Sequence, residues 1–281
     1  MSVRIDPGNT DQLRAWDGAE GAFWAAEAEL FEHALHRYDH SLLRAAGILP
    51  GNKVLDVGCG TGSLTRAVAE RNHPGTALGV DLSSPMVAIA SRSAEVAGLR
   101  NVEFLQADAQ VYPFADDEFD VVVSRTGSMF FADQLAAFEN LARTTRPGGR
   151  LALLSWRSAA ENEWFTSLAA ALSAGRELPS PPAGAPGPFS HADTARVTEV
   201  LVAAGFDKPS FEALDEPMYF GPDVPTAERF VLGVLGWLVD GLDDETRAQA
   251  LEALRIDLQT HLTAEGVAYA SSAWLIGSRA V

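Results

Sequence analysis

A glycine-rich segment directly after a short apolar run is the strongest chemical signal in the sequence. The run 54–57 reads Val-Leu-Asp-Val, and Gly58-Cys59-Gly60-Thr61-Gly62 follows it. Glycines let a backbone pass close to a ligand and open a helix N-terminus towards it, which predicts a small-molecule binding loop. A dinucleotide fingerprint needs Gly-x-Gly-x-x-Gly or Ala, but Ser63 stands three residues after Gly60. The spacing therefore disfavours a nicotinamide-dependent oxidoreductase.

Two aspartates stand at the ends of the next predicted strands. Asp81 closes the apolar run 77–80. A carboxylate there can accept hydrogen bonds from the two hydroxyls of a ribose, and the alternative is a solvated aspartate at a strand end. Asp108 can accept from an adenine amino group while the backbone of Ala109 meets the ring nitrogens, and its alternative is a cap or turn residue. Together with the glycine loop, these acids predict a nucleoside site.

Histidines supply the candidate general bases. His33, His36 and His40 stand at i, i+3 and i+7 on a segment with helical periodicity. Imidazoles at that spacing can share a metal ion, but we expect a polar helix face and predict no metal site. His33, His36 and His191 remain candidates for a base that acts on an acceptor. Cys59 has no paired base and is expected to be a small packing residue.

The elements that must position these residues alternate between strands and helices. Five apolar runs predict strands at residues 54–57, 77–80, 102–105, 119–123 and 150–156. Such alternation predicts an α/β fold, a doubly wound and mostly parallel sheet with helices on both faces. Later runs at 210–214 and 268–278 bring the expected sheet to seven strands.

These motifs together resemble the class I S-adenosylmethionine-dependent methyltransferases, and among them the small-molecule enzymes of quinone biosynthesis and natural-product tailoring. The resemblance covers roughly residues 50–155. It rests on Val54–Gly62, Gly79–Ser83 with Met86, Gln106–Ala109, Pro113–Asp120 and Leu141–Leu151. It implies a Rossmann-like methyltransferase fold, the cofactor S-adenosyl-L-methionine, and methyl transfer to a small, partly apolar molecule.

The resemblance also implies which residues contact the cofactor. Those expected at its methionine part are Asp56, Gly58, Cys59, Gly60 and Ser124; Asp81 would bind the ribose, and Leu82, Met86, Asp108 and Ala109 would contact the adenine. All of them fall at the carboxyl ends of predicted strands, where ligands of open α/β sheets bind.

An acceptor pocket is expected beyond the cofactor. Arg125 would lie beside the acceptor, and aromatic residues would roof the cleft, although each alone also fits ordinary core packing. The expected substrate-binding residues are Trp16, Trp24, Arg125, Phe130 and Trp156, and Phe131, Trp164 and Trp237 belong to the same aromatic group.

Three regions organise the chain in this interpretation. Residues 1–48 would form an N-terminal helical cap, and 49–215 with 266–281 the Rossmann-like cofactor-binding core. Residues 216–265 would be a helical insertion that caps the substrate, because a helical pair there interrupts a terminal strand hairpin.

Composition limits the partners. The net charge of −17 over 281 residues repels phosphate backbones, so no nucleic-acid partner is expected. The sequence has no long apolar run and no apolar signal core at its start, so we expect a cytoplasmic protein without a membrane partner.

Several functional questions stay open at this stage. The acceptor atom (oxygen, nitrogen or carbon), the general base and the oligomeric state are not determined. A methyltransferase-fold protein that binds the cofactor but catalyses a non-methylating reaction such as cyclisation is an alternative, and a nicotinamide-dependent oxidoreductase is the least favoured.

Overall fold

The strands form one mixed sheet in the computed structural model, which describes residues 4–178, 182 and 184–281. They are β1 (Lys53–Val57), β2 (Thr76–Asp81), β3 (Val102–Gln106), β4 (Phe119–Arg125), β5 (Thr145–Trp156), β6 (Ser210–Gly221), β7 (Leu262–Thr263) and β8 (Gly266–Arg279). Their order is β3-β2-β1-β4-β5-β8-β6, and the short β7 pairs with β8 outside this path.

Strand directions agree with the expected doubly wound, mostly parallel sheet. All pairs among β1 to β5 are parallel, whereas β8 runs antiparallel to β5, β6 and β7. The path holds the seven expected strands, and the expectation of seven in total is corrected to eight by β7. This two-residue strand pairs with the start of β8 in a tight hairpin, and it is too short to leave an apolar pattern in the sequence.

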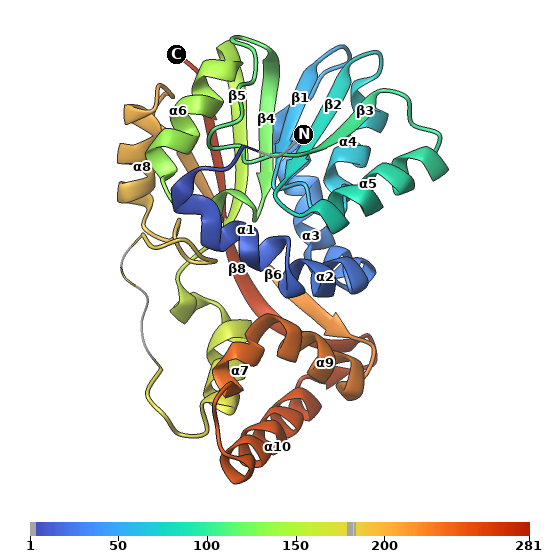
Figure 1. Ribbon diagram of the computed structural model, residues 1–281, viewed down its shortest axis with the longest axis vertical. Helices are drawn as coiled ribbons and strands as arrows, with labels where there is room; N and C mark the ends of the chain where they lie inside the picture. Colours follow the sequence, from blue (N-terminus) through green and yellow to red (C-terminus); the bar gives the residue numbers. More distant parts are fainter. Residues whose placement is uncertain (1–3, 179–181, 183) are drawn as a thin grey trace.

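Helices lie on both faces of the sheet and below its lower edge in Figure 1. They are α1 (Thr10–Trp16), α2 (Ala19–Ala26), α3 (Ala28–Ala46), α4 (Ser63–Asn72), α5 (Ser84–Val96), α6 (Gln134–Thr144), α7 (Glu163–Ser173), α8 (Thr194–Ala203), α9 (Val224–Leu235) and α10 (Asp244–Thr260). Four short 3-10 turns join them: η1 (Pro7–Asn9), η2 (Ser128–Phe130), η3 (Ala159–Glu161) and η4 (Gly236–Val239).

The central strands are buried on both faces. On β4, Val121 and Val123 join an apolar layer that includes side chains of α3 and α4. Val122 between them joins the opposite layer, which includes side chains of α6 and α8. All three side chains are fully buried. The run of valines therefore serves a parallel strand covered on both sides, as its sequence predicts.

The last two long strands extend beyond the parallel part of the sheet. Figure 1 shows β6 and β8 running down into a second group of helices, α7, α9 and α10. The expected boundary between core and insertion, at residues 215 and 216, falls inside β6 and needs correction. The strand continues to Gly221, which pairs with Val267, because β8 is long enough to pair with it up to that residue.

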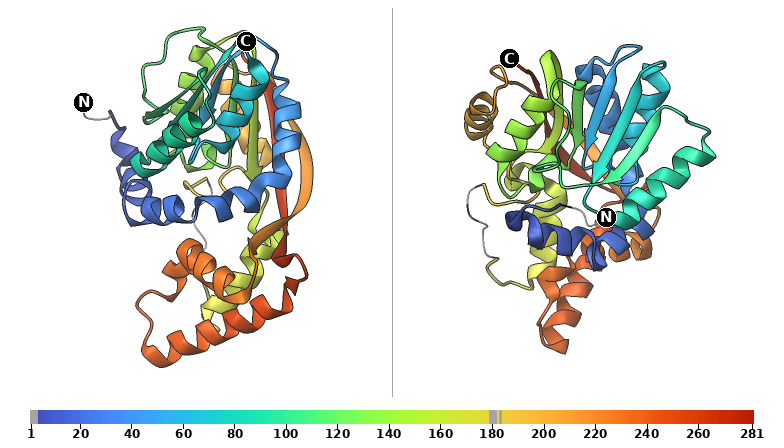
Figure 2. Two further views of the ribbon diagram at one scale, coloured as in Figure 1. Left: turned by 90° about the vertical axis from the view of Figure 1, so that its right-hand side faces the viewer. Right: turned by 45° about the horizontal axis from the view of Figure 1, so that its top comes forward.

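The N-terminal helices fill the space between the sheet and this lower group. In Figure 2, α1 and α2 lie between the two in both views. Phe23 of α2 packs against Phe230 of α9, with ring centroids 6.2 Å apart. The first helices and the insertion, far apart in the sequence, thus enclose one region together.

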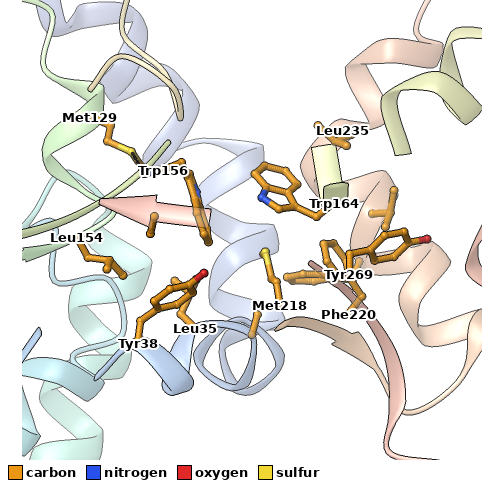
Figure 3. Close-up of a cluster of buried hydrophobic side chains, with 14 of the residues drawn as sticks. Leu35, Tyr38, Met129, Leu154, Trp156, Trp164, Met218, Phe220, Leu235 and Tyr269 are labelled. Carbon is orange, nitrogen blue, oxygen red and sulfur yellow. Dashed lines mark hydrogen bonds between the residues drawn. The ribbon is translucent and has the colours of Figure 1, made fainter. Parts of the chain in front are cut away.

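A buried aromatic cluster joins the sheet to the lower helices. Trp156 ends β5, and its ring lies 5.6 Å from that of Trp164 in α7 and 5.8 Å from that of Tyr38 in α3. Figure 3 shows these side chains between the sheet and the insertion, with Met218 and Phe220 of β6 beside them. All five are buried, so this cluster fixes the insertion against the core. Across the described ranges, no helix has both the length and the apolarity needed to cross a membrane.

Candidate functional site

The carboxyl ends of four neighbouring parallel strands meet at one cavity. Gly58 follows β1, Asp81 ends β2, Asp108 comes shortly after β3, and Thr126 follows β4. All four line a cavity with a volume of about 680 Å³. The sheet topology therefore gathers the residues that the sequence analysis placed at separate strand ends.

The glycine loop has a backbone that other residues rarely adopt. Gly58, Gly60 and Gly62 have φ angles of 68°, 54° and 78°, which lie in the left-handed region. A Cβ atom on Gly58 would lie 2.7 Å from the Cα atom of Gly127. The loop can thus pass tightly beside the segment that follows β4 and keep the cavity open above it.

Asp81 fastens this loop and still faces the cavity. Its Oδ2 accepts a hydrogen bond from the amide of Gly60 at 2.8 Å, and its Oδ1 accepts one from the amide of Ser83 at 2.8 Å. Burial raises the pKa of Asp81 above its ordinary value. Each carboxylate oxygen carries two lone pairs, so the group can accept further bonds from a diol. This chemistry fits the expected ribose contact.

Asp108 lines the cavity, but the N-terminal segment already binds its carboxylate. The Asn9 side-chain amide donates to Oδ1 and Oδ2 at 3.0 and 2.9 Å. The amides of Asp6 and Gln110 donate at 3.0 Å each. These four bonds match the acceptor capacity of a carboxylate. The expected bond from an adenine amino group to Asp108 would therefore have to displace one of them, whereas Ala109 lines the cavity as expected.

Leu82 and Met86 also line this cavity, as expected of residues that pack on an adenine. Ser83, between them in the chain, caps α5 by accepting a hydrogen bond from the amide of Met86. The cap fixes the first turn of the helix, and with it the position of Met86. The adenine contact itself remains a prediction.

A small recess of about 40 Å³ adjoins the glycine loop. Asp56 and Cys59 line it, and Gly58, Gly60 and Arg125 line both the recess and the large cavity. Burial raises the pKa of Asp56 to about 6, while the Thr65 hydroxyl donates to its carboxylate at 2.6 Å. Burial also raises the pKa of Cys59, which keeps it a neutral packing thiol.

Arg125 ends β4 at the border between recess and cavity. Its Nη1 donates to Asp39 Oδ1 at 2.7 Å and its Nη2 donates to Ser63 Oγ at 2.8 Å. Only 9% of its side chain is exposed. The guanidinium is therefore held in one place, against the start of α4.

Ser124 does not reach the cavity and needs correction as a cofactor-binding residue. Its side chain is fully buried. The hydroxyl donates to the carbonyl of Val57 at 2.7 Å and accepts from the amide of Ser128 at 3.0 Å. It lies beneath the site, where it joins the ends of β1 and β4, because strand alternation points it away from Arg125.

The three histidine candidates for a base are also displaced from the cavity. His33 and His36 are exposed on α3, where His33 stacks on Tyr219 with ring centroids 4.2 Å apart. The buried face of α3 carries Leu35 and Tyr38 instead. Within the described parts of the chain, no three His, Cys, Asp or Glu side chains are grouped to hold a metal ion.

His191 is fully buried beside β5, outside the residues that line the cavity. Its Nδ1 lies 3.0 Å from the hydroxyl of Ser155, and its ring packs 5.9 Å from that of Phe138. Burial lowers its pKa to about 4. Its role in the structure is therefore that of a neutral core residue, and the expectation of a base is corrected.

Aromatic side chains form much of the cavity wall. The rings of Trp16 and Phe130 lie 5.0 Å apart, and those of Trp16 and Trp24 lie 6.1 Å apart. Every member of the predicted aromatic group contributes to the lining: Trp16, Trp24, Phe130, Phe131, Trp156, Trp164 and Trp237. The acceptor-binding role of these residues stays a prediction, and the cavity supplies the apolar pocket that it requires.

Other lining residues escaped the sequence analysis. Asn9, Thr126 and Met218 line the cavity, as do Asp240 and Arg247 of the insertion. Asp240 and Arg247 are exposed on the insertion and resemble ordinary surface residues in the sequence. The φ angle of Thr126 is 60°, an unusual value for a β-branched residue, but no sequence pattern marks it.

Comparison with known proteins identifies the central part of the chain. Residues 54–149 match the family model described as a methyltransferase domain. A demethylmenaquinone methyltransferase of Thermus thermophilus is 43% identical over 104 residues, which are 37% of this chain and 47% of that protein. An uncharacterized protein of Mycobacterium bovis is 37% identical over 152 residues, 53% of this chain and 54% of that protein. The chain thus spans about half the length of the curated relatives it matches.

Solved structures support the same fold. A phosphoethanolamine N-methyltransferase of Haemonchus contortus, solved in complex with S-adenosyl-L-methionine, matches with a TM-score of 0.60 and 18% identity. The match covers 98% of this chain and 60% of that one. The expected Rossmann-like methyltransferase fold is confirmed. Residues 54–149 therefore match a methyltransferase domain, and the described chain has the Rossmann-like fold of solved methyltransferases.

Proposed function

We propose that this protein binds S-adenosyl-L-methionine at the carboxyl ends of its parallel strands and transfers the methyl group to a small, partly apolar molecule. One observation carries the proposal. A single cavity of about 680 Å³ is lined both by the glycine loop with Asp81 and by the aromatic group. Polar groups for a nucleoside and apolar walls for a second molecule are what a two-substrate transfer requires.

The chain's own residues fit each part of the cofactor. Asp81 would accept the ribose hydroxyls, and Leu82 and Met86 would pack on the adenine. Gly58 and Gly60 would leave room for the methionine end. When bound, S-adenosylmethionine supplies a methyl group that is already activated by a positively charged sulfur.

The residues that line the cavity indicate how the protein would promote methyl transfer. They favour alignment of the two reactants over proton transfer. Among the described residues, the charged side chains that line the cavity are Asp81, Asp108, Arg125, Asp240 and Arg247. The first three lie at the strand ends, and the last two are exposed on the insertion. Most of the other lining residues are aromatic or aliphatic. Catalysis would therefore rest on holding the acceptor in line with the methyl group and on excluding water.

A screen with isotopically labelled S-adenosylmethionine tests the proposal. Candidate acceptors would be apolar molecules that carry a phenol, an amine or an activated carbon. We expect a labelled product from the wild-type protein with at least one class, and little from Asp81→Ala. An unlabelled, rearranged product would favour the cyclisation alternative. Failure of the wild-type protein to bind S-adenosylhomocysteine in calorimetry would contradict the proposal itself.

A further inference from the structure

We infer that Arg125 is the residue that recognises the carboxylate of the cofactor's amino-acid end. The inference rests on the proposed function and revises the expectation that Arg125 contacts the acceptor. Its starting point is the recess of about 40 Å³ beside the glycine loop. Gly58, Gly60 and Arg125 line both this recess and the large cavity, so the two spaces adjoin.

The recess has the polarity of an amino-acid site. Among its described lining residues, the charged ones are Asp56 and Arg125, one of each sign. An amino acid is a zwitterion with an ammonium and a carboxylate group. Asp56 can attract the ammonium group, and Arg125 can pair with the carboxylate. The adenosine part has no such pair of charges, so the recess suits only the methionine end of the cofactor.

The guanidinium is held ready for a planar anion. Asp39 and Ser63 accept from Nη1 and Nη2 at 2.7 and 2.8 Å. A guanidinium has five N–H donors, so these two bonds orient the fork without using all of it. Its shape matches a carboxylate in two parallel hydrogen bonds. With 9% of the side chain exposed, the group has little freedom to swing toward the acceptor.

The acidic residues around the recess require a cation there if a carboxylate is to bind. Asp39 binds Arg125, and Asp56 lies close enough to feel its charge. A further carboxylate near Asp39 and Asp56 would be repelled by both acids without the positive charge of Arg125. The nearby Arg66 cannot replace it. Arg66 donates to the carbonyl of Thr61 at 2.7 Å and lines neither the recess nor the cavity.

Two nucleosides distinguish a contact with the amino-acid end from a contact with the adenosine part. S-Adenosylhomocysteine carries the amino-acid end, whereas 5′-methylthioadenosine lacks it. Isothermal titration calorimetry would measure both dissociation constants for the wild-type protein, Arg125→Gln and Arg71→Gln. For Arg125→Gln we expect S-adenosylhomocysteine to bind about 10- to 100-fold more weakly, the range of a charged hydrogen-bonded contact, with little change for 5′-methylthioadenosine. Arg71→Gln serves as the matched control and should change neither, because Arg71 donates to the carbonyl of Ala67 in an exposed bond within α4.

A general loss of structure would weaken the binding of both ligands, so the ratio of the two dissociation constants reports the loss of this one contact. Equal weakening of both ligands in Arg125→Gln would overturn the inference, as would unchanged binding of both. Because removal of Arg125 leaves Asp39 unpaired, the double variant Arg125→Gln/Asp39→Asn should give the same altered ratio. Arg125→Lys, which keeps the charge but not the planar fork, should restore part of the preference. A wild-type protein that binds neither nucleoside would refute the proposed function instead.

Discussion

The side-chain amide of Asn9 donates to both carboxylate oxygens of Asp108, at 3.0 and 2.9 Å. The same amide group accepts, through Oδ1, a hydrogen bond from the backbone of Ala132 at 3.0 Å. Asn9 therefore ties the N-terminal segment to the loop after β3 and to the segment between η2 and α6. Both side chains are almost fully buried, so their pairing closes the site on the side of α1.

The first prediction concerns this pair. Asn9→Ala should lower the free energy of unfolding by about 1–3 kcal/mol, because it leaves the buried Asp108 with fewer donors. It should also speed proteolysis within α1 and α2. Denaturant titration and limited proteolysis would measure these effects. Thr10→Ala, which removes only an exposed hydroxyl bonded to the Pro7 carbonyl, is the control. Equal behaviour of the two variants would contradict the role assigned to Asn9.

A second prediction addresses the ribose contact. Asp81→Ala should weaken S-adenosylhomocysteine binding by about 1–3 kcal/mol in calorimetry, through unpaired ribose hydroxyls and a loosened Gly60 amide. The control is Asp120→Ala, since Asp120 accepts from the amide of Lys53 at 2.6 Å, at the start of β1 and away from the site. Binding that stays at the wild-type value in Asp81→Ala would remove the basis for placing the ribose there.

A third prediction tests the tight passage of the glycine loop. The substitution Gly58→Ala would place a Cβ atom 2.7 Å from the Cα atom of Gly127, on a backbone with a φ angle of 68°. Gly51 also has a positive φ angle, 88°, but open space around it. Gly51→Ala should cost about 1–2 kcal/mol from φ alone. Gly58→Ala should cost about 1–3 kcal/mol more, because the backbone must shift. Thermal and chemical unfolding would compare the two variants. Equal losses of unfolding free energy would show that the close approach of Gly58 to Gly127 does not restrict the residue at position 58.

A fourth prediction follows from the buried His191. Burial lowers its pKa to about 4 in the folded protein, below the ordinary value of 6.5. The unfolded chain therefore binds the proton first, and folding stability falls as the pH drops from about 6.5 towards 4. The full loss is about 3 kcal/mol. At pH 7 and above this contribution is absent.

Asp56 acts with the opposite sign over part of the same range. Its folded-state pKa is raised to about 6 by burial, so its unfavourable contribution shrinks as the pH falls below that value. The test is therefore the difference between the wild-type protein and His191→Gln. The free energy of unfolding of the wild type, relative to the variant, should fall by about 3 kcal/mol between pH 7 and pH 4. A constant difference would contradict the burial of a neutral imidazole.

A fifth prediction concerns the aromatic wall. Trp16→Ala should reduce acceptor turnover more than it lowers the melting temperature, because the ring of Trp16 lines the cavity and is only partly buried. Trp274 packs against Phe211 and does not line the cavity. Trp274→Ala should therefore lower the melting temperature while leaving the acceptor KM unchanged. A large drop in melting temperature with normal turnover in Trp16→Ala would make that residue part of the core alone.

Residues whose roles depend on their immediate neighbours could be predicted from the sequence. The glycine loop, Asp81 and the capped start of α5 each follow directly on a strand, so their position needs only the local pattern. The parallel direction of β1 to β4 then guarantees that such strand ends share one edge. For the same reason the α/β class and the mostly parallel sheet could be predicted from the sequence, whereas the order of the strands comes from the structure.

Which side chains face the cavity and which lie beneath it depends on how the elements pack together. Ser124 and Arg125 are adjacent in the chain, yet one is buried beneath the site and the other borders it. The bond between Asn9 and Asp108 and the seating of α9 on α2 join segments that are distant in sequence. No local pattern encodes such contacts, because they arise when apolar surfaces of separate elements are buried together. That burial placed His191 in the core and the insertion over the site.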